Sequence, residues 1–304
     1  MINQAFLQAL RTEMPRLYWQ TDVPMSRYTT LRVGGPADCM AEPGSEDELV
    51  SLLKLARRFD IPVTVIGNGS NLLVRDGGIR GLVIRFGRAF SACSVADDML
   101  SARSGILQPD LSQHALNAGL SGLEFASGIP GTLGGATVMN AGAYGGEIAQ
   151  VIVSAEVLSG DEIVTLDRDA MELSYRHSRM QRTGELVLSA RFRLTRDDPE
   201  SIRSRMADLQ ARRRDKQPLN LPSAGSFFKR PAGAYAAWLI DEAGLKGCRV
   251  GGAMVSEKHA GFLVNTGDAT ATDFLALMRR VQETVYRNSG FELEPEVRII
   301  GEDA

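Results

Sequence analysis

GLEFASGIPGTLGGATVMNAGAYGGEI, residues 122–148, is the stretch that most restricts the fold and function of this chain. Eight glycines fall between Gly122 and Gly146, and mostly small residues separate them. Because glycine lacks a Cβ and tolerates positive φ, successive backbone N–H groups can turn toward an anion at close range. The stretch therefore favours a loop that binds phosphates through main-chain donors. Tight turns with close backbone packing explain the same glycines equally well.

A second element of this kind, GNGSN at residues 67–71, directly follows the β-branched run VTVI at residues 63–66. Two such loops suit a diphosphate. The chain has no G-x-G-x-x-G fingerprint, no Walker A sequence and no G-x-S-x-G elbow. These absences disfavour ordinary dehydrogenases, P-loop enzymes and α/β-hydrolases.

The composition is that of an ordinary globular protein: 304 residues, 44% hydrophobic and 23% charged. A net charge of -3 argues against a generic nucleic-acid binder. Three widely spaced cysteines indicate free thiols, and the three histidines lack the spacing of metal ligands, so we expect no metal. The N-terminal residues do not read as a secretory signal, and no stretch approaches the length of a membrane span. We expect a cytoplasmic protein.

The first part of the chain alternates helices and strands. Residues 2–14 read as an amphipathic helix and residues 31–40 as a strand. A helix follows Ser45, whose spacing to Glu48 suits a capping box, and Pro62 ends that run. The strands VTVIGNGSNLLV and GIRGLVIRF then predict an α/β lobe that ends near Gly87.

The rest of the chain divides in two. Residues 90–195 carry short strands around one helix and the glycine-rich segment, and a charged helix follows, ending before Pro218. A helix at 234–247, a strand GFLVNT, a helix at 271–290 with an apolar face, and a final strand EVRIIG complete the C-terminal part. We expect an α/β (α+β) protein with parts at 1–87, 88–200 and 201–304, and strand 297–304 is a candidate to return to the first part.

Three more segments carry candidate chemistry: YRHSRM with Arg176, SAGSFFKRP with Ser226, and LEPEVRII with Glu296. Taken singly, each has a plain structural explanation. Arg176 suits a surface ion pair, Ser226 a turn and Glu296 a solvated strand entry. Spacing alone does not bring the three together.

Seven stretches in order along nearly the whole chain resemble the UDP-N-acetylenolpyruvoylglucosamine reductase family. They are TTLRVGGPA, VIGNGSNLLVRDGGIRGLVI, LEFASGIPGTLGGATVMNAGAYGGEI, YRHSR, SAGSFFKRP, LIDEAGLKG and LEPEVRIIG. The resemblance implies a two-lobed FAD-binding fold of the vanillyl-alcohol-oxidase type with a smaller C-terminal α/β substrate-binding domain. It also implies non-covalent FAD, NADPH as co-substrate, and reduction of an enolpyruvyl ether of UDP-N-acetylglucosamine to UDP-N-acetylmuramate for peptidoglycan.

The same resemblance assigns roles to individual residues. Arg176 matches the arginine that stabilises the intermediate, Ser226 the proton donor and Glu296 the catalytic glutamate. Substrate contacts are implied for Tyr175, Lys229 and Arg230, although Arg230 stands where many relatives have asparagine. FAD contacts are implied for Gly67, Asn68, Gly69, Ser70, Asn71, Gly128, Ile129, Gly131, Thr132, Gly135, Asn140, Ala141 and Gly142.

The chain resembles the shorter subclass of the family, since it shows no counterpart of an extra substrate-covering loop that carries a tyrosine. We expect a monomer that binds a nucleotide sugar and NADPH, and neither nucleic acid nor membrane. Two alternatives stay open. One is an FAD-dependent oxidase of the same fold acting on a small alcohol or amine. The other is a non-catalytic protein that binds flavin or a nucleotide sugar.

Overall fold

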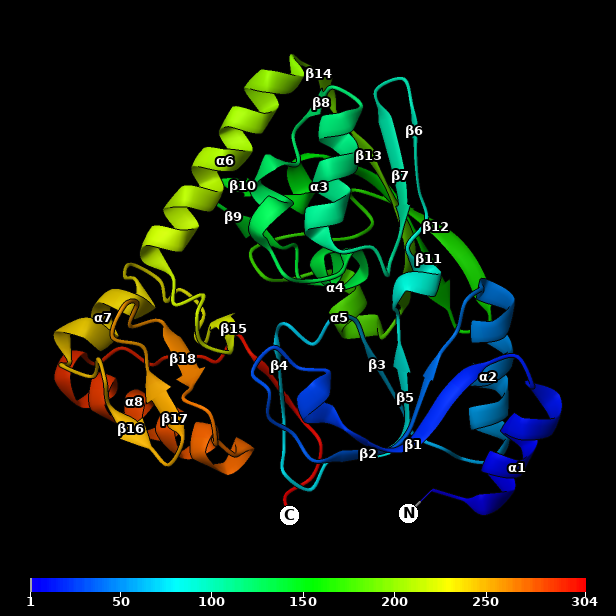
Figure 1. Ribbon diagram of the computed structural model, residues 1–304, viewed down its shortest axis with the longest axis horizontal. Coiled ribbons are helices and arrows are strands. Elements are labelled where there is room, and N and C mark those ends of the chain that lie inside the picture. Colours follow the sequence, from blue (N-terminus) through cyan, green and yellow to red (C-terminus); the bar gives the residue numbers. More distant parts are fainter. Residues whose placement is uncertain (1) are drawn as a thin grey trace.

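The computed structural model describes residues 2–304, which form three parts that meet at the centre of the molecule (Figure 1). In the first part, α1 (Gln4–Glu13) and α2 (Glu46–Arg58) pack on a sheet in the order β1-β2-β5-β3. Strand β1 (Tyr18–Pro24) is antiparallel to its neighbour, whereas β2 (Pro36–Glu42), β5 (Ile79–Arg85) and β3 (Val63–Ile66) run parallel.

The predicted start of α2 is confirmed, because the Ser45 hydroxyl accepts a hydrogen bond from the backbone N–H of Glu48. The predicted strand at 31–40 is correct only from Pro36 onward. Leu31 and Val33 are buried in the core of the C-terminal part. The alternation of apolar and polar residues at this point therefore reflects packing between the two parts and not a strand. A positive φ of 126° at Gly34 turns the chain between the two segments.

The second part is built on an antiparallel sheet in the order β12-β11-β13-β7-β6. Its strands are β6 (Cys93–Ala96), β7 (Met99–Arg103), β11 (Ile152–Ser159), β12 (Glu162–Asp167) and β13 (Leu186–Arg193). The helices α3 (Gln108–Asn117), α4 (Leu133–Val138) and α5 (Arg179–Thr183) belong to this part. Two short pairs complete it: β8 (Leu120–Ser121) with β14 (Thr195–Arg196), and β9 (Gly142–Ala143) with β10 (Gly146–Glu147).

Short 3₁₀ turns join several of these elements, at Met25–Arg27, Arg88–Phe90, Glu124–Gly128 and Ile148–Gln150. The charged helix α6 (Pro199–Lys216) then leads from the second part to the third (Figure 1). The Asp198 carboxylate accepts from the N–H of Ser201 and caps its start. Only Ile202 and Met206 are buried along α6, so most of the helix faces solvent.

The third part is a sheet in the order β15-β18-β17-β16 with two helices. Its strands are β15 (Ser223–Ser226), β16 (Arg249–Val250), β17 (Ala253–Val255) and β18 (Phe262–Asn265). Helix α8 (Ala271–Ser289) buries the predicted face of Phe274, Leu277, Met278, Val281 and Val285. Helix α7 (Ala236–Glu242) is shorter than predicted, because the chain turns at Gly244 with φ of 68°.

The last strand, β19 (Arg298–Ile300), leaves the third part and pairs in parallel with β4 (Leu72–Val74) of the first part (Figure 1). The chain therefore connects the third part to the rest of the molecule at two places, through α6 and through β19. Within residues 2–304 no helix is both long and apolar enough to cross a membrane.

Candidate active site

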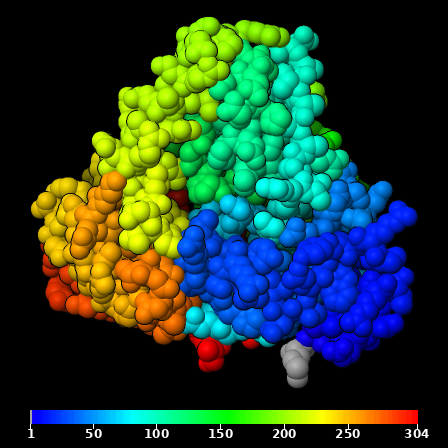
Figure 2. All heavy atoms as spheres, in the orientation of Figure 1, coloured from blue at the N-terminus to red at the C-terminus, as the bar shows by residue number. Residues whose placement is uncertain are grey.

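A cavity of about 650 Å³ lies where the three parts meet, and Figure 2 shows the molecule hollowed there. This volume falls within the usual range for small-molecule and cofactor sites. Five segments contribute to its wall. They are the glycine loop that follows β3, the glycine-rich segment before and along α4, the end of α6, the end of β15 and the start of β19. Between residues 2 and 304, side chains of His, Cys, Asp and Glu form no group of three that suits a metal ion.

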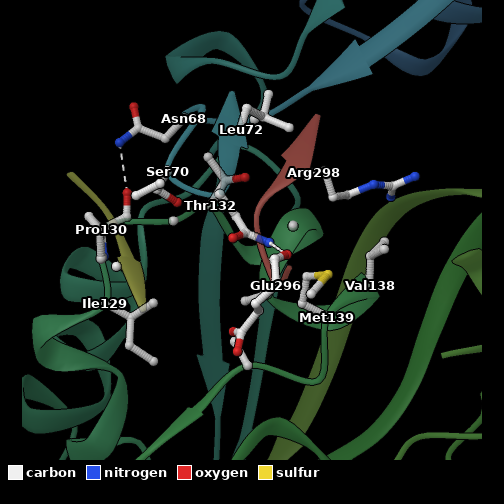
Figure 3. A pocket seen from close by; sticks show the side chains of 18 of the residues that line it. Asn68, Ser70, Leu72, Ile129, Pro130, Thr132, Val138, Met139, Glu296 and Arg298 are labelled. Atoms are coloured by element: carbon white, nitrogen blue, oxygen red, sulfur yellow. Dashed lines mark hydrogen bonds between the residues drawn. The ribbon is translucent and has the colours of Figure 1, made fainter. Parts of the chain in front are cut away.

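The two glycine loops lie against each other in the wall of this cavity. Asn68 Nδ2 donates to the Pro130 carbonyl oxygen at 2.7 Å, a contact drawn in Figure 3. A Cβ on Gly67 would lie 2.1 Å from Thr132 Oγ1, and one on Gly69 would lie 1.9 Å from the Tyr28 carbonyl oxygen. Glycine is therefore required at both positions by close approach of neighbouring chain segments.

The loops also present unused main-chain donors. The N–H groups of residues 67–71 bond to no protein acceptor within residues 2–304, and the same is true of Gly131, Thr132 and Gly135. Buried backbone donors are nearly always satisfied, by protein, by water or by a ligand. Donors on two facing loops fit a diphosphate, as FAD contains, so the residues present suit that cofactor.

Arg176 and Glu296 meet in the cavity although 120 positions separate them in the sequence. Arg176 Nε lies 2.5 Å from Glu296 Oε1, and the two side chains are only 20% and 13% exposed. Arg176 Nη2 also lies 3.4 Å from the Gly142 carbonyl oxygen. Gln181 Nε2 donates to the backbone oxygen of Arg176 at 3.0 Å and restrains the residue from the other side.

Ser226 ends β15 and faces the same cavity with an exposed side chain. The next residue, Phe227, ties this segment to its neighbours: its N–H donates to Gly261 at 2.8 Å, and its carbonyl accepts from the N–H of Glu296 at 2.9 Å. These bonds place the segment of Ser226 alongside that of Glu296. All three residues proposed for catalysis thus line one cavity.

Burial raises the pKa of the Glu296 carboxyl above its ordinary value. The charges of Arg176 and Lys229 and the hydrogen bond from Arg176 oppose this rise but do not cancel it. A glutamate with a raised pKa can hold a proton closer to neutral pH than an exposed one.

Most of the other predicted residues line the cavity too. The wall includes Gly67, Asn68, Gly69, Ser70, Asn71, Ile129, Gly131, Thr132, Gly135, Ala141 and Gly142. Gly128 and Asn140 are not among the residues that line it. Asn140 is fully buried, and its side chain donates to the Ser174 carbonyl and accepts from the N–H of Ala149, so it joins two loops that shape the wall.

Tyr175, Lys229 and Arg230 lie near the cavity but not on its wall. The Tyr175 hydroxyl accepts from the backbone N–H of Arg230 at 3.2 Å. The Arg230 guanidinium lies 3.9 Å from the centroid of the Tyr235 ring. Lys229 forms an ion pair with Glu294. All three side chains are thus engaged with neighbouring groups outside the cavity wall.

Several wall residues have no counterpart among the predictions. Arg213, Lys216 and Gln217 come from the end of α6, Arg298 from β19, and His259 from the loop before β18. The run RRRDKQ at residues 212–217 indicated only a charged helix, because the spacing of its residues does not show which helical turn lines a cavity. His259 forms a local hydrogen bond: its Nδ1 accepts from the N–H of Gly261 at 3.2 Å, and burial lowers its pKa.

Two family models match the chain. One, described as an FAD binding domain, spans residues 37–167 and includes both glycine loops. The other, described as the C-terminal domain of UDP-N-acetylenolpyruvoylglucosamine reductase, spans residues 217–300. These matches confirm the expected FAD-binding fold with a distinct C-terminal domain, and FAD as the cofactor.

Full-length relatives carry the same name. The UDP-N-acetylenolpyruvoylglucosamine reductases of Agathobacter rectalis and Latilactobacillus sakei are each 51% identical, covering 99% and 98% of this chain and 100% and 97% of their own lengths. The crystal structure of the reductase from Thermus caldophilus superposes with a TM-score of 0.80 at 39% identity, over 93% of this chain and 98% of that one. The chain therefore belongs to the UDP-N-acetylenolpyruvoylglucosamine reductase family.

Proposed function

We propose that this chain reduces the carboxyvinyl ether of UDP-N-acetylglucosamine to UDP-N-acetylmuramate with NADPH, and that Arg176, Ser226 and Glu296 carry out the chemistry. The observation that supports this most is the 2.5 Å contact of Arg176 with Glu296 in the cavity that Ser226 also lines. Bound FAD supplies a hydride, taken from NADPH, to the terminal carbon of the vinyl ether.

Arg176 stabilises the charge that the substrate develops. Hydride addition at C3 moves negative charge through C2 into the carboxylate, which becomes an enolate. A fixed cation aimed at that carboxylate lowers the barrier, because it meets more charge in the transition state than in the substrate. Arginine suits the task, since it stays protonated and presents a planar fork to two oxygens.

Glu296 assists Arg176 as a neutral acid. Its pKa is already raised by burial. A substrate carboxylate beside Arg176 would compete for that guanidinium and add a second negative charge nearby, which raises the pKa of Glu296 further. The protonated carboxyl can then donate a hydrogen bond to the enolate oxygen.

Ser226 delivers the proton to C2. A serine hydroxyl is a weak acid, so it needs a strongly basic acceptor and accurate placement. The enolate carbon is such an acceptor. The hydrogen bonds of Phe227 to Gly261 and Glu296 support the placement, since they restrain the segment that carries Ser226.

The FAD contacts belong to the same proposal. Residues 67–71 and the loop from Gly128 to Gly135 bind the FAD diphosphate through their main-chain donors. Asn140, whose side chain bonds to Ser174 and Ala149, would support this region, and Ala141 and Gly142 would contact the cofactor from the wall. Tyr175, Lys229 and Arg230 bind the nucleotide sugar at the rim, where Arg230 suits a phosphate or carboxylate in place of the amide of many relatives.

We assign three structural domains on the same basis: residues 1–87 together with the returning strand at 297–304, residues 88–200, and the remainder of the segment 201–304, which ends at residue 296. The pairing of β19 with β4 supports the return of the C-terminal strand to the first domain. We further propose that the protein works in the cytoplasm as a monomer and binds no nucleic acid, in line with its net charge of -3.

One anaerobic experiment tests the reaction. The NADPH-reduced protein is mixed with the carboxyvinyl sugar nucleotide, and the absorbance of oxidised flavin is followed. We expect that absorbance to return in the absence of oxygen, with UDP-N-acetylmuramate as the product. Reoxidation only when oxygen is admitted would point to an oxidase and overturn the proposal.

A further inference from the structure

Arg213 is a cation on the cavity wall without an anionic partner. Its side chain lies against Gly128, where a Cβ would come within 3.0 Å of Arg213 Cδ and Nη1. Throughout residues 2–304 it forms no ion pair and no side-chain hydrogen bond. The preceding residue behaves as surface arginines usually do: Arg212 Nη2 pairs with Asp208 Oδ2 at 2.8 Å and is 59% exposed.

The surroundings of Arg213 are unfavourable for a charge with no partner. Burial lowers the pKa of its guanidinium, and Tyr144 offsets this only in part. Removing a cation from water without pairing it costs free energy. A ligand that brings a negative charge to this part of the wall removes that cost.

The charges of the whole cavity wall also favour an anionic ligand. Its cations outnumber its carboxylates, and each carboxylate already pairs with an arginine: Glu296 with Arg176, and Glu185 with Arg179, which lies off the wall. The other wall cations are Arg213, Lys216 and Arg298. Beside Arg213, the buried Gln217 Oε1 also finds no hydrogen-bond partner within residues 2–304.

We propose that Arg213 binds a phosphate group of a diphosphate ligand held in this cavity, and that FAD is the ligand. The inference rests on the proposed function, which places both FAD and a nucleotide sugar here, and both contain a diphosphate. FAD is favoured because Arg213 packs on Gly128, at the start of the loop whose N–H groups of Gly131, Thr132 and Gly135 are unused.

The location of Arg213 gives this contact a second consequence. The residue lies in the last turn of α6, the helix that leads into the C-terminal domain. Binding of FAD would therefore restrain one of the two connections of that domain and hold it over the cavity.

The test compares three holoenzymes with the unmodified protein: Arg213→Met, Arg213→Lys and Arg212→Met. Methionine keeps most of the apolar stem and removes the charge. FAD dissociation is measured on dilution, from the fluorescence of released flavin. The KM for the carboxyvinyl sugar nucleotide and for NADPH is measured with excess FAD. A charge-assisted contact predicts a Kd for FAD raised about 10- to 100-fold in Arg213→Met. Arg213→Lys should restore most of the affinity, and Arg212→Met should match the unmodified protein.

The possible results distinguish an FAD phosphate site from a substrate phosphate site and from no phosphate site. A higher Kd for FAD with both KM values unchanged supports the FAD diphosphate. A higher KM for the sugar nucleotide with unchanged FAD binding would overturn FAD as the ligand and assign the phosphate site to the substrate. If no affinity changes, or only the flavin reduction potential shifts, Arg213 is not a phosphate ligand. Failure of the unmodified protein to reduce the sugar nucleotide would overturn the proposed function while the FAD measurement still reports on Arg213.

Discussion

Arg176 adopts a backbone conformation that L-residues rarely use, with φ of 54°. Such strain costs free energy and persists only where the surroundings enforce it. Here Gln181 binds its carbonyl, and Glu296 binds its guanidinium. The strain and the ion pair together aim the side chain across the cavity instead of toward solvent, which is what the proposed stabilisation of an enolate requires.

Ser226→Ala should separate the two halves of the reaction. NADPH should still reduce the flavin at the normal rate, because that step needs no proton donor to C2. Oxidation of the reduced flavin by the sugar nucleotide should slow by about 100- to 10,000-fold, the usual range for loss of a general acid. Stopped-flow absorbance under anaerobic conditions measures both steps. An unchanged second step would show that Ser226 is not the proton donor.

Glu296→Gln should reveal the raised pKa through stability. A carboxyl whose pKa is raised by burial favours folding fully below its unfolded value, 4.5, and loses that contribution as the pH rises through the folded pKa. Glutamine does not titrate. The unfolding free energy of the unmodified protein, relative to the variant, should therefore fall with rising pH by at most about 1.4 kcal/mol per pH unit. Urea unfolding at several pH values measures it, and a difference that grows with pH would contradict the shift.

Among the structural elements, the two glycine loops depend both on their local sequence and on contacts with distant segments of the chain. A glycine-rich run indicates flexible, Cβ-free backbone, but not what approaches it. The structure shows that Tyr28, from a turn in the first domain, closes on Gly69, and that Thr132 closes on Gly67. Each glycine therefore has a steric partner that its own sequence neighbourhood does not contain.

Gly69→Ala should cost the protein its FAD, and Gly160→Ala provides the matched control. Both residues have positive φ, 61° and 63°. The backbone strain from alanine is thus similar at the two positions. Only Gly69 is crowded, because the space around Gly160 holds no atom within 4 Å of an added Cβ. The ratio of flavin to protein absorbance after purification should drop in the first variant and stay normal in the second. Equal retention would mean that the 67–71 loop can shift without affecting the cofactor.

On the scale of the whole molecule, Asp76 joins the first domain to the third. Its carboxylate accepts from the N–H groups of Ala271 and Thr272, each at 2.8 Å, and from the Thr272 hydroxyl at 2.7 Å. It thus caps α8 from a distant part of the chain, where a negative charge also suits the helix dipole. Burial raises its pKa, but the hydrogen bonds from Thr272 and Ala271 outweigh this and lower it overall.

Asp76→Ala should destabilise the protein by about 1 kcal/mol at neutral pH, the usual cost of losing a helix cap. Folding lowers the pKa of Asp76. Its carboxylate therefore stabilises the fold at pH values above 3.8, the pKa in the unfolded chain, and this stabilisation is lost as the pH falls through the folded pKa. Thermal unfolding at neutral and acid pH measures the change. Asp303→Ala removes an exposed ion pair with Arg75 and should have little effect. A loss for Asp76→Ala that persists in acid would argue against a charged cap.

The local elements and the order of the family motifs could be predicted from the amino-acid sequence alone. Ser45 capped its helix and the apolar face of α8 packed inward, because these features depend on neighbours a few residues apart. The long-range contacts could not be predicted in this way, because the fold brings together residues that local periodicity does not relate. Leu31 and Val33 therefore pack on another domain, Glu296 meets Arg176, and the last turn of α6 brings Arg213 to the cavity.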